Sequence, residues 1–593
     1  MKVSYQVSQE VSKAFASLYS KELNADFFQI ESTKTVFEGD QTLVVFPLLK
    51  ITKKSPEESA TVIGEWLMLN SELFSNFNVV KGFLNLTLKA SFWLSEFNEC
   101  LGQENYGINA VKSGKTYMVE YSSPNTNKPL HLGHLRNNFL GYAVAEILKA
   151  NGHKVIKTQI INDRGIHICK SMLAWQKFGN GETPESSNLK GDHLIGKYYV
   201  AFDRAYKKEV AELIERGVSK DDAEKQTTIL KEAQNILLKW ENKDPEIYNL
   251  WEKMNNWVYK GFDQTYKLMG VDFDKLYYES DTFLLGKDVV SKGLESGVFY
   301  KNEDGSVWCD LSEDKLDDKL LLRADGTSVY MTQDLGTAVE RYKDYSNLSG
   351  LIYTVGNEQN HHFKVLFTIL KKLGYSWADE CYHLSYGMVE LPEGRMKSRE
   401  GTVVDADDLI LSVVNDAKEM TKERGQISGM SEDERTSLYE TIGKGGLKYY
   451  LLKVDPKKKM MFNPAESIDL NGNTGPFIQY CYARIQSILR KEKLEVNKIN
   501  TDISLSPQEL DLIKLLADYP SVISEAGENL SPAVIANYSF NLVKAYNSFY
   551  QSIPILGEKD QQLREFRIVL SEKISLVIKN AMKLLGINVP QKM

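Results

Sequence analysis

Cysteine is scarce in this chain of 593 residues. Its five cysteines lie far apart and form no C-x-x-C pair; they are Cys100, Cys169, Cys309, Cys381 and Cys481. This spacing gives no support for a disulfide framework or a zinc site, and it is typical of a reducing compartment. We therefore predict a cytoplasmic protein without a metal site.

Long apolar runs are also missing. No uninterrupted stretch approaches the roughly 18–20 apolar residues that span a bilayer, and the N-terminal segment MKVSYQVSQEVSK has no signal-peptide core. We therefore expect no membrane partner.

An excess of positive charge is missing as well, since the formal net charge is −8. This balance argues only weakly against a nucleic-acid partner, because local basic surface governs phosphate binding. The apolar fraction of 42% and the charged fraction of 26% are ordinary for a globular protein. The length exceeds one hydrophobic core, so we expect roughly three or four domains.

Changes of pattern divide the chain into three predicted domains, at residues 1–110, 111–455 and 456–593. In the first, Ser55 and Glu58 form a capping box at a helix start, and TLVVFPLL and FLNLTL have the pattern of strands. The middle domain contains a charged helical stretch at about 170–275, which we interpret as an insertion. The last domain has a helical pattern to its end.

The middle domain begins with a predicted strand, helix and strand, at residues 115–121, 133–150 and 154–161. The helix has an apolar stripe of helical period and ends at Asn151-Gly152. Strand patterns return at LIYTV (351–355) and HLSYGMVEL (383–391). This βαβ unit predicts an α/β fold with a Rossmann-type, doubly wound parallel sheet.

The turn between the first strand and the helix is SSPNTNKPLHLGHLRN (122–137), with His131 and His134 three residues apart. A helix N-terminus binds anions, and doubly wound sheets bind ligands beyond the carboxyl ends of their strands. Gly133 has no Cβ, so a flat ring can approach the backbone there. Two surface histidines beside a cap are the alternative, but the strand before and the helix after favour a phosphate-binding turn.

A second polar segment, GRMKSREG (394–401), is rich in cations. Arg395, Lys397 and Arg399 alternate, so in an extended loop their side chains project to one side. Three cations that close over a pyrophosphate explain this pattern, with the flanking glycines as hinges. The alternative is a solvated basic turn. The histidine turn upstream favours the pyrophosphate-binding interpretation over it.

The two segments resemble the signatures of one enzyme family. PLHLGH resembles the His-hydrophobic-Gly-His signature of class I aminoacyl-tRNA synthetases, and E-Y-S-S-P-N-x-x-K-P-x-H-x-G-H-L-R resembles the arginyl-tRNA synthetases in particular. The resemblance implies a catalytic domain with a helical insertion, a small N-terminal α/β domain and an all-α anticodon-binding bundle. It implies ligation of L-arginine to tRNA(Arg) through an arginyl-adenylate, with ATP as substrate and Mg²⁺, by a monomer.

The segment 394–401 is similar to the Lys-Met-Ser-Lys-Ser loop of that class, but it departs from the pattern. Arg395 stands for the first lysine, and Ser398 replaces the second. The resemblance implies four ATP contacts in this loop, from Arg395, Met396, Lys397 and Ser398.

The same resemblance gives His131 and His134 the role of stabilising the phosphates of ATP during adenylation. The role of the missing second lysine we assign to Lys128, just before the histidine turn. The predicted catalytic residues are Lys128, His131, His134, Lys397 and Arg399, and Gly133 joins the histidines in binding ATP.

Arginine as substrate has a clear physical requirement, because a guanidinium needs a carboxylate and neutral acceptors in one plane. The stretch DGTSVYMTQDLGTAVERY places Tyr330 and Asp334 at i and i+4, hence on one face of a predicted helix. An isolated pair of this kind is more often a surface tyrosine and a solvated acid. The whole string, however, resembles the substrate helix of the arginyl family. The implied arginine-binding residues are Glu120, Ser123, Asn125, Tyr330, Asp334 and Gln359, the first three around the α-amino group.

Two further segments, INDRG (161–165) and YGMVEL (386–391), resemble family segments beside the nucleotide and receive no assigned contact. The pair His361–His362 is not interpreted as a metal site, because partners at ligand spacing are missing.

The C-terminal region mixes aromatic and basic residues, as in GNTGPFIQYCYARIQSILRK (472–491). Aromatics at helical spacing usually form a core, but the same residues stack on unpaired bases when they are exposed. By resemblance, Tyr550 and Met593 meet anticodon bases, and Phe83 and Asn85 contact the elbow of the tRNA.

Two other hypotheses compete with this interpretation. A cysteinyl-type synthetase of similar build is disfavoured by the missing cysteine/histidine zinc constellation and by Asp334. A catalytically silent relative that only binds tRNA is disfavoured by the intact histidine turn and Lys128.

Overall fold

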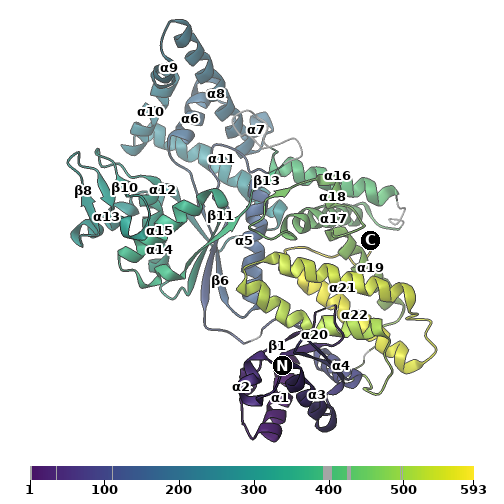
Figure 1. Cartoon of the computed structure of the whole chain (residues 1–593). Helices are drawn as coiled ribbons and strands as arrows, with labels where there is room; N and C mark the ends of the chain where they lie inside the picture. Colours follow the sequence, from purple (N-terminus) through teal and green to yellow (C-terminus); the bar gives the residue numbers. More distant parts are fainter. Residues whose placement is uncertain are drawn as a thin grey trace. The chain divides into compact units, whose positions relative to one another are not determined.

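The computed structural model describes seven stretches of the chain, residues 3–34, 36–109, 111–390, 404–423, 429–494, 496 and 498–593. It divides into two compact units (Figure 1). The first unit comprises Met1–Gly107, Ile485–Val522 and Asn541–Val577. The second unit comprises Ile108–Arg484, Ile523–Phe540 and Ile578–Met593.

A five-stranded parallel sheet lies at the centre of the second unit. Its strands are β5 (Thr116–Glu120), β6 (Lys154–Ile161), β7 (Lys275–Tyr278), β11 (Gly350–Gly356) and β12 (Cys381–Tyr386). The spatial order is β12-β11-β5-β6-β7, and each neighbouring pair is parallel. The predicted doubly wound α/β fold is therefore confirmed.

The order of the strands reverses at β5, which is the first strand in the chain but the middle strand of the sheet. Helices α5 (Leu132–Ala150), α14 (Tyr330–Asp344) and α15 (Asn360–Lys372) connect or follow these strands. Side chains such as Met118, Leu335 and Leu366 are fully buried in the core that they share. In such sheets the crevice for ligands opens at the carboxyl ends of the strands beside the reversal, here β5 and β11.

The predicted insertion is helical and lies between β6 and β7. Its helices are α6 (Ile166–Phe178), α7 (Pro184–Ser187), α8 (Gly191–Glu215), α9 (Lys220–Gln226), α10 (Thr228–Glu241) and α11 (Pro245–Met269). Figure 1 shows these helices gathered at one end of the second unit.

A small antiparallel sheet follows β7, and the sequence patterns did not predict it. Two helices, α12 (Glu279–Thr282) and α13 (Leu285–Glu295), lead into strands β8 (Phe299–Lys301), β9 (Val307–Cys309) and β10 (Lys319–Leu322). Strands of three or four residues are too short to show a clear period, so hydrophobic alternation fails to reveal them.

The predicted strand at 383–391 is divided into two by Gly387. Strand β12 ends at Tyr386, and β13 (Val389–Glu390) pairs with β14 (Met460–Met461) instead. A Cβ on Gly387 would lie 2.5 Å from the Lys458 backbone, so the chains approach there too closely for a side chain. Because β14 lies beyond residue 456, the second unit reaches past the predicted start of the bundle.

Helices cover the rest of the second unit. They include α16 (Ala406–Glu423), α17 (Glu432–Leu452), α18 (Pro464–Ser467) and most of α19 (Gly475–Lys491), together with parts of the helices that follow α19. Arg136 of α5 is buried among them and donates to the carbonyls of Gly387 (2.6 Å) and Lys458 (3.0 Å). This side chain fixes α5 to the segments around β13 and β14.

The first unit contains an antiparallel sheet of order β1-β2-β4-β3. Its elements are α1 (Val3–Tyr19), β1 (Ile30–Ser32), β2 (Gln41–Val44), α2 (Leu49–Thr52), α3 (Pro56–Asn70), β3 (Phe74–Val80), β4 (Phe83–Leu88) and α4 (Ala90–Cys100). The capping box predicted at Ser55 and Glu58 is present at the start of α3.

Parts of the C-terminal helices α20 (Pro507–Glu528), α21 (Pro532–Ser552) and α22 (Gln561–Leu584) belong to the same unit. Lys514 of α20 lies 2.5 Å from Asp40, and the rings of Phe97 and Phe566 are 5.7 Å apart. The N-terminal module therefore packs with C-terminal helices instead of forming a body of its own. In the part of the chain that the structure describes, no helix is long and apolar enough to cross a membrane.

Candidate active site

Asn137 of α5 ties together the carboxyl ends of three parallel strands. Its Oδ1 accepts from the backbone N–H of Ser122, just after β5, at 2.6 Å. Its Nδ2 donates to the carbonyl of Thr354 in β11 (2.6 Å) and to the hydroxyl of Tyr386 in β12 (3.2 Å). The first turns of α5 are therefore held at the reversal point of the sheet.

The histidine turn forms the N-terminus of α5, with His131 as N-cap. Nδ1 of His131 accepts from the N–H of Gly133, and Nδ1 of His134 accepts from the N–H of His131, each at 3.1 Å. The two ring centroids lie 4.0 Å apart. Because both Nδ1 atoms accept, the proton of each neutral ring is on Nε2.

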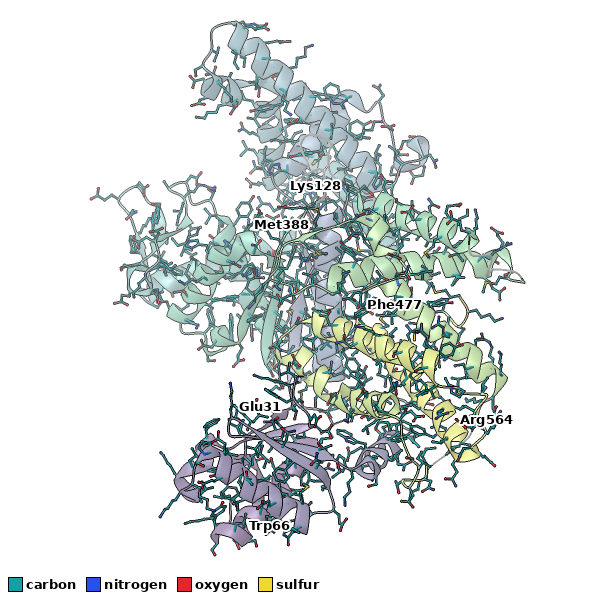
Figure 2. All side chains as sticks on the ribbon, turned by 45° about the vertical axis from the view of Figure 1, so that its right-hand side comes forward. Glu31, Trp66, Lys128, Met388, Phe477 and Arg564 are labelled. Atoms are coloured by element: carbon teal, nitrogen blue, oxygen red, sulfur yellow. The ribbon has the colours of Figure 1, made fainter. Side chains whose placement is uncertain are left out.

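Both rings are neutral in this setting. Burial, helped by Lys128, lowers the pKa of His131 to about 4. Burial also lowers the pKa of His134 far below its ordinary value, with His131 and Lys128 acting in the same direction. Figure 2 labels Lys128, which precedes the two histidines in the turn. It also labels Met388, which lies near Gly356 at the end of β11. The turn therefore offers two neutral N–H donors beside one ammonium group.

The cation-rich segment 394–401 lies outside the described residues, and so do its predicted contacts Arg395, Met396, Lys397, Ser398 and Arg399. The chain resumes at Val404, whose carbonyl accepts from the N–H of Leu132 at 3.2 Å. The N–H of Ala406 donates to the carbonyl of Leu130 at 3.0 Å, and Asp405 forms an antiparallel bridge with His131. The residues that follow the segment are thus paired with the histidine turn.

Asp334 has a partner that the sequence did not predict. Nε2 of His362, near the start of α15, lies 2.6 Å from its Oδ2. Tyr330 begins α14 and is 76% exposed, and the Asp334 side chain one turn later is 42% exposed. Gln359, in the short 3₁₀ turn Asn357–Gln359, is exposed three residues before His362. Asp334, near the start of α14, and Gln359, just before α15, are therefore linked through the contact between Asp334 and His362.

Glu120, at the end of β5, forms an ion pair inside the protein. It is buried and forms an ion pair with Arg341 of α14, which is only 1% exposed. The hydroxyl of Ser123 also donates to its carboxylate. Burial raises the pKa of Glu120 above its ordinary value, although Arg341 opposes this effect. The sequence did not reveal Arg341 as the partner of this predicted arginine contact.

Glu279 is a further acid at this edge of the sheet, and no sequence motif pointed to it. It follows β7 directly and hydrogen-bonds Gln333 of α14. Burial raises its pKa to about 7; Arg164 opposes the rise, and the neighbouring Asp163 and Asp334 add to it. A carboxyl group with acidic neighbours of this kind favours a cation beside it.

The INDRG segment contributes a buried connector, Asp163. Its carboxylate accepts from the N–H (2.8 Å) and hydroxyl (2.7 Å) of Ser280 and from the hydroxyl of Tyr259 at 2.8 Å. Its carbonyl accepts from the ring N–H of Trp251 at 2.6 Å. Asp163 thus joins the end of β6 to helix α11 of the insertion. Asn125 is exposed and forms a parallel bridge with Asn162 in the same region.

The predicted tRNA contacts differ in exposure. Phe83 is 39% exposed and packs edge-on against Phe46, at 5.3 Å between centroids. Asn85 is only 1% exposed, and its amide accepts from Thr42 at 2.7 Å and donates to Asn78 at 2.9 Å. This geometry gives Asn85 an internal role in the sheet and leaves Phe83 as the accessible side chain of the pair.

The two C-terminal candidates lie in different units. Tyr550 is 39% exposed and stacks on Tyr546 in α21. Met593 packs against a buried cluster of α16 and α17 formed by Ala417, Leu438 and Ile442.

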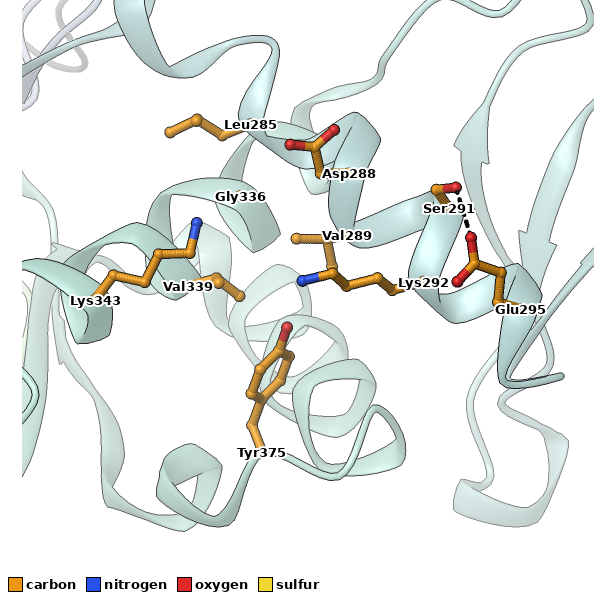
Figure 3. Close-up of a pocket in the computed structure, with 10 residues that line it drawn as sticks. All are labelled: Leu285, Asp288, Val289, Ser291, Lys292, Glu295, Gly336, Val339, Lys343 and Tyr375. Atoms are coloured by element: carbon orange, nitrogen blue, oxygen red, sulfur yellow. Dashed lines mark hydrogen bonds between the residues drawn. The ribbon is translucent and has the colours of Figure 1, made fainter.

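A pocket of about 280 Å³ lies between α13 and α14 (Figure 3). The ammonium of Lys292 and the hydroxyl of Tyr375 point into it. It is lined by Gly336, Val339 and Lys343, which at 100° per residue lie on the face of α14 opposite to Asp334. This pocket is therefore separate from the predicted arginine site.

Comparisons with known proteins agree with the geometry. The family described as tRNA synthetases class I (R), catalytic domain, matches residues 96–463, and the DALR anticodon binding domain matches residues 478–593. The arginine–tRNA ligase of Bacteroides thetaiotaomicron is 55% identical and is covered over the full length of both chains. That of Flavobacterium psychrophilum is 57% identical over 96% of this chain and 97% of the relative.

A solved structure shows the same fold. The arginyl-tRNA synthetase of Thermus thermophilus superposes with a TM-score of 0.78 over the whole of both chains, at 22% sequence identity. The strand reversal, the histidine turn and these relatives together assign the family. The chain belongs to the class I arginyl-tRNA synthetases, which use ATP to join arginine to tRNA in protein synthesis.

Proposed function

We propose that adenylation of arginine takes place at the carboxyl ends of β5 and β11, with the phosphates of ATP at the histidine turn. The observation that carries this proposal is the fixed orientation of the two imidazoles. Since both Nδ1 atoms of His131 and His134 accept backbone hydrogen bonds, their Nε2–H groups remain as donors. Donors oriented in advance stabilise the charge that develops on the phosphorus oxygens at no cost of reorganisation.

The guanidinium of arginine is proposed to bind Asp334, with Tyr330, Gln359 and Glu279 around it. A pair of partly buried carboxylates suits a permanent cation, and burial raises the pKa of Glu279 to about 7 although Arg164 opposes the rise. The α-amino group would lie nearer to the end of β5, beside Ser123, Asn125 and the Glu120–Arg341 pair.

Lys128 is proposed to supply the fixed positive charge beside the histidines. Arg395, Lys397 and Arg399 assist it, since their segment leads directly into Val404, which is hydrogen-bonded to the turn. Met396, Ser398 and Gly133 complete the ATP contacts. Mg²⁺ enters as part of the substrate, bound to the phosphates of ATP.

Outside the active site, the proposed tRNA contacts are Phe83 at the elbow and Tyr550 and Met593 at the anticodon. The enzyme is proposed to act as a monomer in the cytoplasm. The five cysteines support the second proposal, because all are free and buried.

The test is the replacement His134→Ala. Loss of one preorganised donor lowers kcat for tRNA charging by about 10²–10³-fold. His153→Ala is the matched control, because His153 lies beyond the opposite end of α5 and bonds Ser113. Unchanged kcat in H134A would refute the role of the histidine turn.

A further inference from the structure

Charged side chains of the helical insertion meet the residues that follow the cation-rich segment. Nε2 of His193, in the first turn of α8, lies 3.3 Å from Oδ2 of Asp405 and 3.5 Å from Oδ2 of Asp407. Lys190, just before α8, forms an ion pair with Asp407. The hydroxyl of Thr265 in α11 donates to Oδ1 of Asp407 at 2.9 Å. Two insertion helices and the start of α16 thus share one cluster.

The cluster has the side chains of a metal site, but it also contains the ammonium group of Lys190. The ligand atoms of His193, Asp405 and Asp407 lie within 4.8 Å of one another. Contacts with Asp405 and Asp407 raise the pKa of His193 to about 10, which favours the charged form of the ring beside the two carboxylates. The ammonium of Lys190 pairs with Asp407 and also lies 3.3 Å from the buried carboxylate of Asp192. An internal ion network is therefore the better interpretation.

Asp405 and its neighbours connect this network to the histidine turn. Oδ1 of Asp405 caps α16 by accepting from the N–H groups of Asp407 (2.8 Å) and Asp408 (3.2 Å). The same residue forms the antiparallel bridge with His131. The flanking hydrogen bonds run from Leu132 to Val404 and from Ala406 to Leu130.

Helix α8 also packs directly against the chain before the turn. A Cβ on Gly196 would lie 2.9 Å from the ring of Pro129. The insertion therefore contacts both paired segments. It packs against the chain just before residues 130–132, and its charged side chains bind residues 404–407.

We propose that Lys190 and His193 are positioning residues for adenylation. They hold Asp405 and Asp407, and the pairing of residues 404–406 with 130–132 transmits this hold to His131 and His134. The helical insertion is in this way coupled to the chemistry on ATP. The inference rests on the proposed role of the histidine turn.

Loss of either cation should slow adenylation because removing one partner from a partly buried charge network costs free energy. Without Lys190 or His193, one cation is left beside three carboxylates, those of Asp405, Asp407 and the buried Asp192, so Asp405 and Asp407 repel each other more and are held less firmly. A displacement of about 1 Å at a catalytic group can reduce the rate by about 100-fold.

The experiment compares Lys190→Met, His193→Leu and His193→Gln with the control Lys207→Met, which removes an exposed ion pair elsewhere on α8. Charging of tRNA is measured at varied ATP and varied arginine, with thermal unfolding of each variant. We expect K190M and H193L to lower kcat/KM for ATP by roughly 10- to 100-fold while KM for arginine changes less than about twofold. H193Q retains an N–H donor and recovers most of the activity, and K207M equals the wild type.

A double-mutant cycle separates positioning from mere stability. If His193 acts through the turn, H193L costs much less activity in the H134A background than alone, because both changes disable one unit. Full additivity, or equal losses for ATP and arginine that follow the folded fraction, would overturn the inference. Active K190M and H193L beside an impaired H134A would refute this inference alone, whereas an active H134A would refute the proposed function.

Discussion

At the scale of single residues, the proposed site depends on which ring nitrogens of His131 and His134 carry protons. The backbone N–H groups of the turn bind Nδ1 of His131 and His134 and so turn Nε2–H outward. Burial keeps the rings neutral, so they act as donors, and Lys128 nearby supplies the positive charge. A buried pair of imidazolium ions would repel each other, which this arrangement avoids.

Asp334→Ala tests the arginine half of the site. Removing the carboxylate deprives the guanidinium of a charge-assisted partner, so KM for arginine rises by about 10- to 100-fold. KM for ATP stays near the wild-type value. Kinetics of tRNA charging measure both constants, and an unchanged KM for arginine would exclude Asp334 from the pocket.

Glu279 predicts a pH dependence of arginine binding. Its pKa of about 7 means that the carboxyl group is neutral below this pH and charged above it. Affinity for the guanidinium therefore rises by about tenfold from about pH 6 to about pH 8, because the charged form binds the cation. Titration calorimetry with Glu279→Gln as control should show a flat profile for the variant. A wild-type profile as flat as that of E279Q would remove Glu279 from the site.

The sequence predicted the residues of the turn but not their partners. His131, His134 and Asp334 were predicted because the strings around them resemble segments of the arginyl family. Their partners lie far away in sequence: Asp334 meets His362, 28 residues on, and Glu120 meets Arg341 of another helix. Such pairs form only when the sheet brings β5, α14 and α15 together, and no local pattern encodes them.

At the scale of elements, helix α5 supports the proposed ATP site. Its glycine at position 141 lies against Tyr121, the residue after β5, and a Cβ there would be 2.4 Å from the Tyr121 Cβ. The close approach allows Asn137 to reach β11 and β12 at once. Strand end and helix start are thus fixed relative to each other.

Gly141→Ala should therefore destabilise the fold although alanine favours helices. Overpacking at this contact lowers the free energy of unfolding by about 1–3 kcal/mol, which outweighs the gain in helix propensity. Urea denaturation measures the change. A variant more stable than the wild type would show that α5 is free to shift away from β5.

Long elements were predicted well and short ones poorly. The βαβ unit has a clear apolar period and the insertion is a long charged helical stretch, and both types were confirmed. Strands β8, β9, β10, β13 and β14 have only two to four residues each, and their pairing depends on distant segments. The division of 383–391 at Gly387 follows from a close contact with Lys458, which the sequence does not reveal.

At the scale of the whole molecule, the chain returns twice to each unit. Residues after 456 supply β14 and the helix turns that complete the second unit, and residues before 107 pack with C-terminal helices in the first. A truncation at residue 456 would therefore remove part of the catalytic unit, so point variants test the tRNA contacts more cleanly.

Tyr550→Ala tests the proposed anticodon contact. Loss of one aromatic stack raises KM for tRNA by roughly 5- to 100-fold, since such stacking contributes about 1–3 kcal/mol. Tyr300→Ala is the control, a tyrosine of similar exposure at 38% in the other unit. Equal KM values for tRNA in both variants and the wild type would refute the contact.

The central claim is that phosphate donors on α5 and the guanidinium acceptor on α14 form one site at the carboxyl edge of one sheet. Calorimetric binding of a non-hydrolysable arginyl-adenylate analogue tests this claim, because the analogue must reach both. We predict at least about 100-fold tighter binding than for arginine alone, with marked weakening in both H134A and D334A. Binding no tighter than that of arginine, or unaffected by H134A, would contradict the account.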